Sequence, residues 1–278
     1  DKAVEWLREN GLAKAEKKAG RIAAEGIVKT FISADGKNAS MVEVNSETDF
    51  VAKNDKFQDF VGDVVEQING SAAEDVEAFL AEAWAKDSSK TVKEELASMV
   101  ATIGENMNIR RFAKLSADNG VVVDYIHAGG KIGVLIAAET DNTGDEVVEC
   151  LKNVAMQIAA MNPEYLSADD VSEEYKEKEK KILLEQAKND PKNAGKPENI
   201  IEKMIIGRLN KELKEVCLTE QVYVKAENKE TVAKYVESVA KAVGCNLKLT
   251  GFVRYETGEG LEKKEEDFAA EVAAQMNA

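Results

Sequence analysis

The spacing of apolar residues along the chain alternates between the two-residue period of a strand and the longer period of a helix. Residues 26–32 and 41–44 alternate on either side of Asp35-Gly36-Lys37-Asn38, which predicts a β-hairpin. A helix ending at Asn69-Gly70-Ser71 should follow, because apolar residues then recur three and four positions apart. These residues are Phe57, Phe60, Val61, Val64, Val65 and Ile68.

The same order of elements returns in the second half of the chain. Residues 121–126 and 132–139 alternate around the turn His127-Ala128-Gly129-Gly130, and a helix is predicted over 145–161. The strand-to-helix junctions also look alike when Val44 to Asp49 is set against Ile136 to Asp141. A duplicated strand-strand-helix unit explains this pattern, with helices over one face of antiparallel strands. The predicted fold class is therefore α+β, with two related antiparallel-sheet/helix subdomains.

Further segments complete these subdomains. Helices are predicted over 75–85, 91–103 (stopped at Gly104) and 231–243, and strands over 109–115, 221–225 and 247–256. Residues 171–216 carry only a narrow apolar stripe between charged positions, broken at 189–197 by two prolines and a glycine. This pattern predicts an inserted antiparallel helical hairpin, a coiled coil.

The two ends of the chain are predicted to be helical. A short amphipathic helix should run from Asp1 to a stop at Gly11, followed by a basic link over 14–21. This helix has no partner, and the chain lacks an initiator Met, so we expect the numbering to begin inside a larger protein. At the other end, residues 262–276 are predicted to form an amphipathic helix with Phe268 on its apolar side. This side could pack against the rest of the chain or dock on a partner.

Composition excludes several classes of function. A net charge of -15 repels a phosphate backbone, so we expect no direct binding to nucleic acid. No apolar run is long enough to span a bilayer and no signal peptide is evident, so we expect no membrane association. The chain is expected to be cytoplasmic, with a mitochondrial or plastid location as the alternative. The odd, widely spaced Cys150, Cys217 and Cys245 are expected to be reduced thiols.

Catalytic chemistry has few candidate residues in this sequence. His127 is the only histidine, and no phosphate-binding loop or dinucleotide fingerprint is present. We therefore expect no cofactor and no enzymatic activity. An enzyme that pairs one of the three cysteines with His127 is disfavoured, because none of them lies in a recognisable nucleophile context.

The segment Val42 to Val51 carries the most information. An alternating strand leads to Thr48-Asp49 and then to Phe50. Thr48 or Asp49 could simply cap a helix while Phe50 turns into the core. Alternatively, the segment could push one carboxylate and one aromatic ring into another protein. Both interpretations are compatible with the residues alone.

Four motifs, in order along nearly the whole chain, resemble the translation elongation factor Ts family. They are residues 45–55, Ile103 to Arg111, Tyr125-Ile126-His127 through Gly133-Val134-Leu135, and Glu259-Gly260-Leu261 with residues 267–272. The resemblance implies a guanine nucleotide exchange factor that binds elongation factor Tu in its GDP-bound and nucleotide-free forms. It also implies a division into a remnant of an N-terminal helical module with a basic linker (1–24), a core N-subdomain (25–117), a core C-subdomain (118–170 and 217–258), the inserted hairpin (171–216) and a C-terminal module (259–278).

The resemblance also assigns roles to residues. Asp49 and Phe50 would form an intruding pair that disturbs the magnesium and nucleotide site of elongation factor Tu, with Thr48 and Val51 beside them in the same segment. Further contacts with elongation factor Tu would come from Lys18, Ile103, Gly104, His127 and Phe268.

An alternative of another class is a non-catalytic binding or assembly module that dimerises through the helical hairpin. This alternative requires apolar side chains to be exposed on the hairpin, for which Tyr175, Ile182, Met204 and Leu213 are the candidates.

Overall fold

A computed structural model describes residues 11–262 of the protein. Residues 11–18 are helical, so Gly11 does not stop a helix as predicted. Gly11 is buried, and an added Cβ there would lie at an ordinary contact distance, 4.0 Å, from the Ala97 carbonyl oxygen. The rest of the predicted N-terminal helix, the predicted helix over 262–276 and Phe268 lie outside the described residues.

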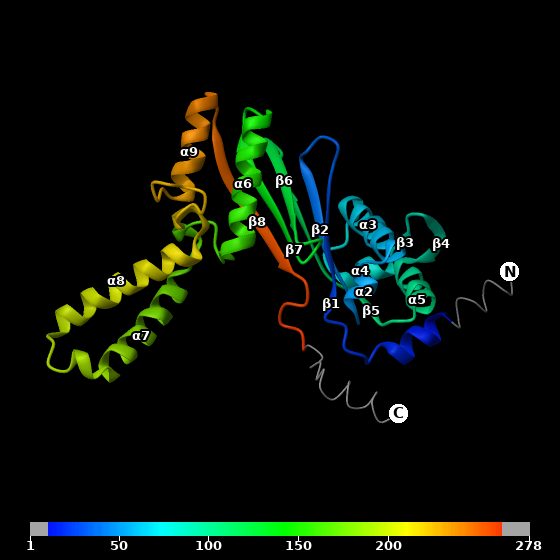
Figure 1. The fold of residues 1–278 in the computed structure, drawn as a ribbon, viewed down its shortest axis with the longest axis horizontal. Coiled ribbons are helices and arrows are strands. Elements are labelled where there is room, and N and C mark those ends of the chain that lie inside the picture. The colour runs from blue at the N-terminus through cyan, green and yellow to red at the C-terminus, as the bar shows by residue number, and fades with distance from the viewer. Residues whose placement is uncertain (1–10, 263–278) are drawn as a thin grey trace, which may run out of the picture.

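Two three-stranded antiparallel sheets form the centre of the molecule (Figure 1). The first has the order β1-β2-β5, and the second has the order β6-β7-β8. Their strands are β1 (Glu25–Ile32), β2 (Asn38–Ser46), β5 (Met107–Ser116), β6 (Gly120–His127), β7 (Ile132–Thr140) and β8 (Leu247–Glu256). Each sheet thus consists of the predicted hairpin and one later strand.

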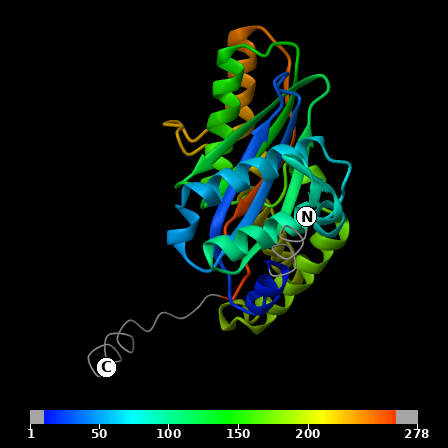
Figure 2. The ribbon, with the colours of Figure 1, turned by 90° about the vertical axis from the view of Figure 1, so that its right-hand side faces the viewer.

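The sheets pack face to face, and helices cover their outer faces. Along β2, Met41 faces the second sheet while Val42 and Val44 face the helices, as expected from the period of a strand. In Figure 1, α3 (Asp55–Gly70) and α5 (Val92–Ile103) lie on one side of the sheets, and α6 (Asp145–Met161) and α9 (Val232–Val243) on the other. Figure 2 shows α3 and α5 crossing the outer face of the first sheet. The result is a four-layer α+β fold.

The two halves share an irregularity in their sheets. Each central strand shifts register once, between Glu43 and Val44 in the first sheet and between Ala137 and Ala138 in the second. Gly26 and Gly120 lie at the same level near the start of the outer strands, where an added Cβ would lie 2.1 Å from the Val44 carbonyl oxygen and 1.9 Å from that of Ala138. Only glycine permits so close an approach of two strands.

These shared positions align the halves differently from the sequence. The structure matches Val44 with Ala138, whereas the similar junction motifs had matched Val44 with Ile136. The predicted strand-strand-helix repeat is present, but the predicted residue-by-residue equivalence is wrong by two positions. A shift of two keeps the side-chain alternation in phase, which explains why the sequence pattern could not reveal the error.

Two segments differ from their predicted structure. The helix predicted over 75–85 is α4 (Val76–Ala81), followed by a small hairpin of β3 (Ala83–Trp84) and β4 (Asp87–Thr91). The hairpin lets Trp84 pack on Phe60, with ring centroids 5.9 Å apart.

The predicted strand over 221–225 is absent, apart from an isolated bridge between Val222 and Thr231. On one side its backbone pairs with residues 230–232, where the Tyr223 N–H donates to the Glu230 carbonyl over 2.9 Å, and on the other side it bonds to a side chain of α6. The Val224 N–H donates to Gln157 Oε1 over 2.9 Å, and the Val222 carbonyl accepts from Gln157 Nε2 over 3.1 Å.

Helices α7 (Glu173–Asn189) and α8 (Glu198–Val216) pack on each other and extend away from the second sheet (Figure 1). Leu183, Ile205 and Leu209 are buried between them. Short 3-10 helices lie before α7 (Ala168–Asp170), between the two helices (Pro191–Asn193) and after α8 (Leu218–Glu220). No helix within residues 11–262 is long and apolar enough to cross a membrane.

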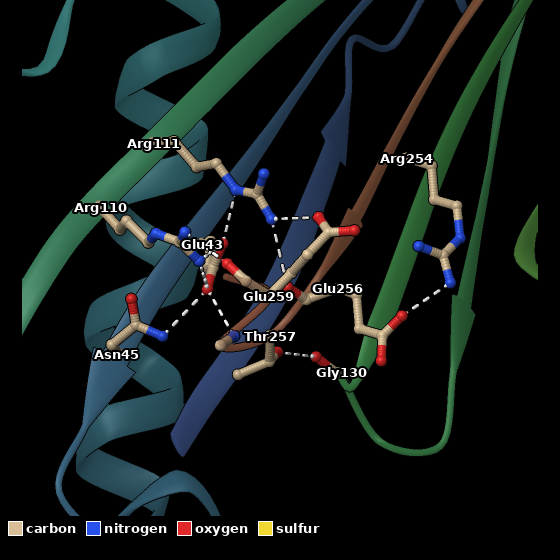
Figure 3. Close-up of polar contacts among 10 residues, drawn as sticks. Glu43, Asn45, Arg110, Arg111, Gly130, Arg254, Glu256, Thr257 and Glu259 are labelled. Carbon is tan, nitrogen blue, oxygen red and sulfur yellow. Dashed lines mark hydrogen bonds and ion pairs between the residues drawn. The ribbon is translucent and has the colours of Figure 1, made fainter. Parts of the chain in front are cut away.

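The chain after β8 returns to the first sheet and is held there by a buried carboxylate (Figure 3). Glu43 accepts hydrogen bonds from Arg110 over 3.0 Å and from Arg111 over 2.6 Å. It also accepts from Asn45 over 3.0 Å and from the backbone N–H of Gly258 over 2.8 Å. Burial alone would raise the pKa of Glu43, but these hydrogen bonds together lower it from the ordinary value of 4.5. Glu43 therefore remains ionised between the sheets.

Candidate partner-binding site

A single helical turn, α2 (Asp49–Ala52), follows β2 at one end of the first sheet. Thr48 caps this turn, because its side-chain oxygen accepts a hydrogen bond from the Val51 N–H over 3.3 Å. Ala52 is buried and Val51 is partly buried against the core, so the two residues anchor the turn. The Phe50 side chain points the other way and is 81% exposed. The turn thus has an anchored base and an aromatic tip in solvent.

Asp49 stands beside this ring and is held by its own helix. The Lys53 ammonium lies 2.6 Å from the Asp49 carboxylate. Its hydrogen bond and charge lower the pKa of Asp49, and the charge of Lys131 acts in the same direction. Asp49 therefore remains an ionised and accessible carboxylate, with a lysine as its present partner.

The base of α2 is tied to the segment that precedes β5. In the antiparallel register Ser46 pairs with Met107, so Glu47 lies opposite Asn106, and Thr48 lies opposite Glu105. Both carboxylates bond across this gap. Glu47 accepts from the Asn106 N–H over 2.5 Å, and Glu105 accepts from the Thr48 N–H over 3.0 Å. These side-chain hydrogen bonds continue the pairing of the two segments beyond the ends of β2 and β5.

A third segment joins the same base. The Lys18 ammonium donates to the Gly104 carbonyl, and the Asn106 side-chain amide donates to the Arg21 carbonyl over 2.8 Å. Gly104 ends α5 in the left-handed region, with a φ of 93°. Ile103, the last residue of α5, packs on the core beside it.

The β6–β7 turn lies at this end of the molecule as well. The Val28 N–H donates to the Gly130 carbonyl over 2.7 Å, which joins the turn to the first sheet. His127 is exposed on this turn, and its Nδ1 shares a hydrogen bond of 2.9 Å with the Tyr125 hydroxyl. Lys131 is close enough to Asp49 to lower its pKa. The turn therefore neighbours α2, although it belongs to the second sheet.

The structure brings together most of the residues that the sequence had singled out. Thr48, Asp49, Phe50 and Val51 form α2 and its cap, while Lys18, at the end of the N-terminal helix, bonds to Gly104, which follows Ile103 at the end of α5. His127 lies on the adjacent turn.

Sequence reasoning assigned no role to Glu47, Glu105 or Asn106. The signal that could have found them is strand pairing: if the strand before residue 47 pairs with the strand after residue 106, these residues must meet.

The two halves also differ in the connection that holds α2. Eleven positions separate Val44 from Asp55, the first residue of α3, but seven separate the equivalent Ala138 from Asp145, the first residue of α6. The difference of four is the length of α2. The exposed tip therefore occupies an insertion that the second half lacks.

The described residues provide no catalytic arrangement at the tip. No cluster of three or more metal-ligating side chains occurs within 11–262. Cys150 and Cys217 are buried, and burial raises the pKa of Cys150 to about 11, which leaves its thiol protonated and unreactive. An exposed ring, a carboxylate and backbone groups can bind another protein and displace groups within it, but they do not form an activated nucleophile.

Comparison with known proteins agrees with this geometry. A family profile described as elongation factor TS matches residues 47–259. Elongation factor Ts of Clostridium botulinum (strain ATCC 19397 / Type A) is 50% identical over 277 residues, which cover 100% of this chain and 89% of that protein. Elongation factor Ts of Clostridium novyi (strain NT) is 51% identical over the same shares. The chain belongs to the elongation factor Ts family.

Proposed function

We propose that this chain releases GDP from elongation factor Tu by inserting Asp49 and Phe50 beside the magnesium and nucleotide site of that protein. Membership in the elongation factor Ts family implies a nucleotide exchange factor for elongation factor Tu, an activity that makes and breaks no covalent bond. The proposal adds which residues act and how. Its main support is the exposure of Phe50, 81%, on a turn whose neighbours are anchored.

The size of the effect limits what the ring can do alone. Moving a Phe side chain from water into an apolar site is worth about 1.5 to 3 kcal/mol. At about 1.4 kcal/mol per decade, this gives about ten- to a hundredfold in affinity. Coupling between ligands is reciprocal, so the exchange factor weakens GDP only as much as GDP weakens the exchange factor. A wider interface must therefore hold the nucleotide-free partner.

The surrounding residues can supply that interface. Lys18, Ile103 and Gly104 flank the tip, and His127 lies on the adjacent turn of the second sheet. Contacts from both halves would hold elongation factor Tu while the tip disturbs its magnesium site. Asp49 would exchange Lys53 for groups of the partner, which costs little because the ion pair is solvent-exposed.

Stopped-flow release of a fluorescent GDP from elongation factor Tu tests this proposal. Phe50→Ala should lower the maximal release rate by about ten- to a hundredfold, the value of the lost burial. Ile206→Ala, which truncates an exposed apolar side chain on the distant helix α8, is the matched control and should leave the rate unchanged. Unchanged release with Phe50→Ala, in a chain that unfolds at the normal temperature, would count against the proposal.

A second candidate, dimerisation through α7 and α8, has narrower support. Of the four apolar residues expected on the outside, only Ile182 is exposed, while Tyr175, Met204 and Leu213 are partly buried. Ile200 and Ile206 are exposed on α8. Sedimentation of the full chain beside Ile182→Glu and Ile206→Glu variants tests this candidate. A monomeric parent chain would exclude it.

A further inference from the structure

We infer that Glu105 is a positioning residue for nucleotide exchange: its carboxylate, reaching across the end of the β2–β5 ladder, fixes the turn that presents Phe50. This inference rests on the proposed function, since it assigns Glu105 a role that acts through the ring. Glu105 itself need not touch the partner.

Helix α2 is very short. Four residues form a single turn, which is unstable by itself because helix nucleation is unfavourable. Its conformation must therefore be imposed from outside. The core packing of Val51 and Ala52 holds the end of the turn, and Thr48 fixes its beginning, since it is the cap of the turn and the last residue opposite the β5 side of the sheet.

Glu105 engages both hydrogen-bonding groups that Thr48 can offer to it. The Thr48 N–H donates to Glu105 Oε2 over 3.0 Å, and the Thr48 hydroxyl donates to Glu105 Oε1 over 2.7 Å. With its proton directed to the carboxylate, the hydroxyl oxygen is free to accept from the Val51 N–H. The carboxylate thus sets both the backbone and the side-chain orientation of the cap, and bonds to a charged acceptor are the stronger kind.

The direction of the tip depends on this base, while Val51 and Ala52 hold the other end of the turn against the core. Phe50 is 81% exposed, so its direction follows mainly from the backbone of α2. Ordering a loose residue at the moment of binding costs about 1 to 2 kcal/mol. A turn that is already fixed avoids this cost. The free-energy barrier is then lower for the step in which the ring enters the partner.

The same base also receives the N-terminal segment. Asn106, the neighbour of Glu105, donates from its side chain to the Arg21 carbonyl and from its backbone to Glu47. Residues 18–21 and the Phe50 turn are therefore fixed to one loop. The N-terminal segment and the Phe50 ring are therefore held in fixed positions relative to each other.

A double-mutant cycle of Glu105→Ala and Phe50→Ala tests the inference, with the maximal rate of fluorescent GDP release and the affinity for nucleotide-free elongation factor Tu as separate readouts. Glu105→Ala should lower the maximal rate by about tenfold, the scale of one lost hydrogen bond to a charged group. In the Phe50→Ala background the same change should have little further effect, because the ring is already gone. Glu105→Gln keeps one acceptor oxygen and should recover part of the rate.

Glu94→Ala is the matched control. Glu94 also accepts from the backbone N–H (2.7 Å) and the hydroxyl of a capping threonine, Thr91, through one of its oxygens at the opposite end of α5. It should lower stability by a similar amount without slowing release. Amide hydrogen exchange provides a readout without the partner: Glu105→Ala should accelerate exchange at Thr48 and Val51, and Glu94→Ala should not.

The outcomes separate the two ideas. If Phe50→Ala slows release but Glu105→Ala does not, or slows it equally with and without the ring, the positioning role of Glu105 is wrong and the proposed function stands. If Phe50→Ala alone leaves release unchanged, the proposed function fails and takes this inference with it. Protection of Thr48 and Val51 that survives Glu105→Ala would also overturn the inference.

Discussion

The Glu43 carboxylate, fully buried between the two sheets, accepts a hydrogen bond of 2.8 Å from the backbone N–H of Gly258, 215 residues further along the chain. Arg110 and Arg111 neutralise this carboxylate and also bind the returning segment. Arg110 donates to the Glu259 carbonyl over 2.6 Å, and Arg111 donates to that of Glu256 over 3.2 Å (Figure 3). One acidic side chain of the first sheet thus holds the segment that follows the last strand of the second sheet.

Glu43→Ala should lower the free energy of unfolding by about 3 kcal/mol, because it leaves two guanidinium groups and a backbone N–H without their acceptor. Urea unfolding followed by circular dichroism measures this change. Glu237→Ala is the control, since Glu237 pairs with Lys241 on the exposed surface of α9 and should contribute little to the free energy of unfolding. Equal losses in the two variants would show that the buried cluster has no special stabilising role.

The stability that Glu43 provides should depend on pH. Its pKa is lowered in the folded protein from the ordinary value of 4.5, so the folded state favours the ionised form. The contribution is complete above about pH 4.5 and disappears as the pH falls through the folded-state pKa. The difference in unfolding free energy between the parent chain and Glu43→Gln should therefore be constant near neutrality and shrink in acid. A difference that grows below pH 4.5 would contradict this assignment.

Gly120→Ala should disrupt the start of the β6–β7 pairing. The new Cβ would lie 1.9 Å from the Ala138 carbonyl oxygen, and backbone must move to relieve the overlap. We expect a loss of about 3 kcal/mol in unfolding free energy. Gly251→Ala, also in the second sheet, is the control, because its nearest neighbour would be Leu115 Cδ1 at 3.8 Å. That variant should stay within about 1 kcal/mol of the parent chain.

The three thiols should differ in their reaction with iodoacetamide. Cys150 is buried and its pKa is raised to about 11, so at pH 8 it holds almost no thiolate. Cys217 is also buried, and burial raises its pKa as well, whereas Cys245 is partly exposed. Mass spectrometry of the native chain should find Cys245 labelled first, and Cys150 and Cys217 only after denaturation. Rapid labelling of Cys150 would reveal an opening that the fold does not explain.

Local signals made part of this fold predictable. The helix over 145–161 and the strand over 247–256 have the predicted bounds, because sequence periodicity and flanking turn residues define both. Thr91 and Gly104 correctly mark the ends of α5, since an N-cap and a left-handed glycine act within one helical turn. Such features need no knowledge of the rest of the chain.

Features that depend on distant segments were not predictable. A glutamate on an alternating strand normally faces water, and Glu43 is buried only because a second sheet and residues 256–259 cover it. Glu105 belongs to the base of α2 only through the pairing of β2 with β5. The segment predicted as a strand over 221–225 makes only an isolated bridge with residues 230–232, and the side chain of Gln157, in α6, takes the hydrogen bonds of its other edge.

The four extra residues of α2 show how a molecule with internal symmetry becomes specialised. Both halves keep the same glycine contact and the same register shift, features that any change would damage. The added turn sits in a surface connection, where extra length costs little. One place at which the two halves cease to superimpose is therefore also the place of the proposed contact with elongation factor Tu, and in a chain built from repeats such broken symmetry is a reason to test a segment for function.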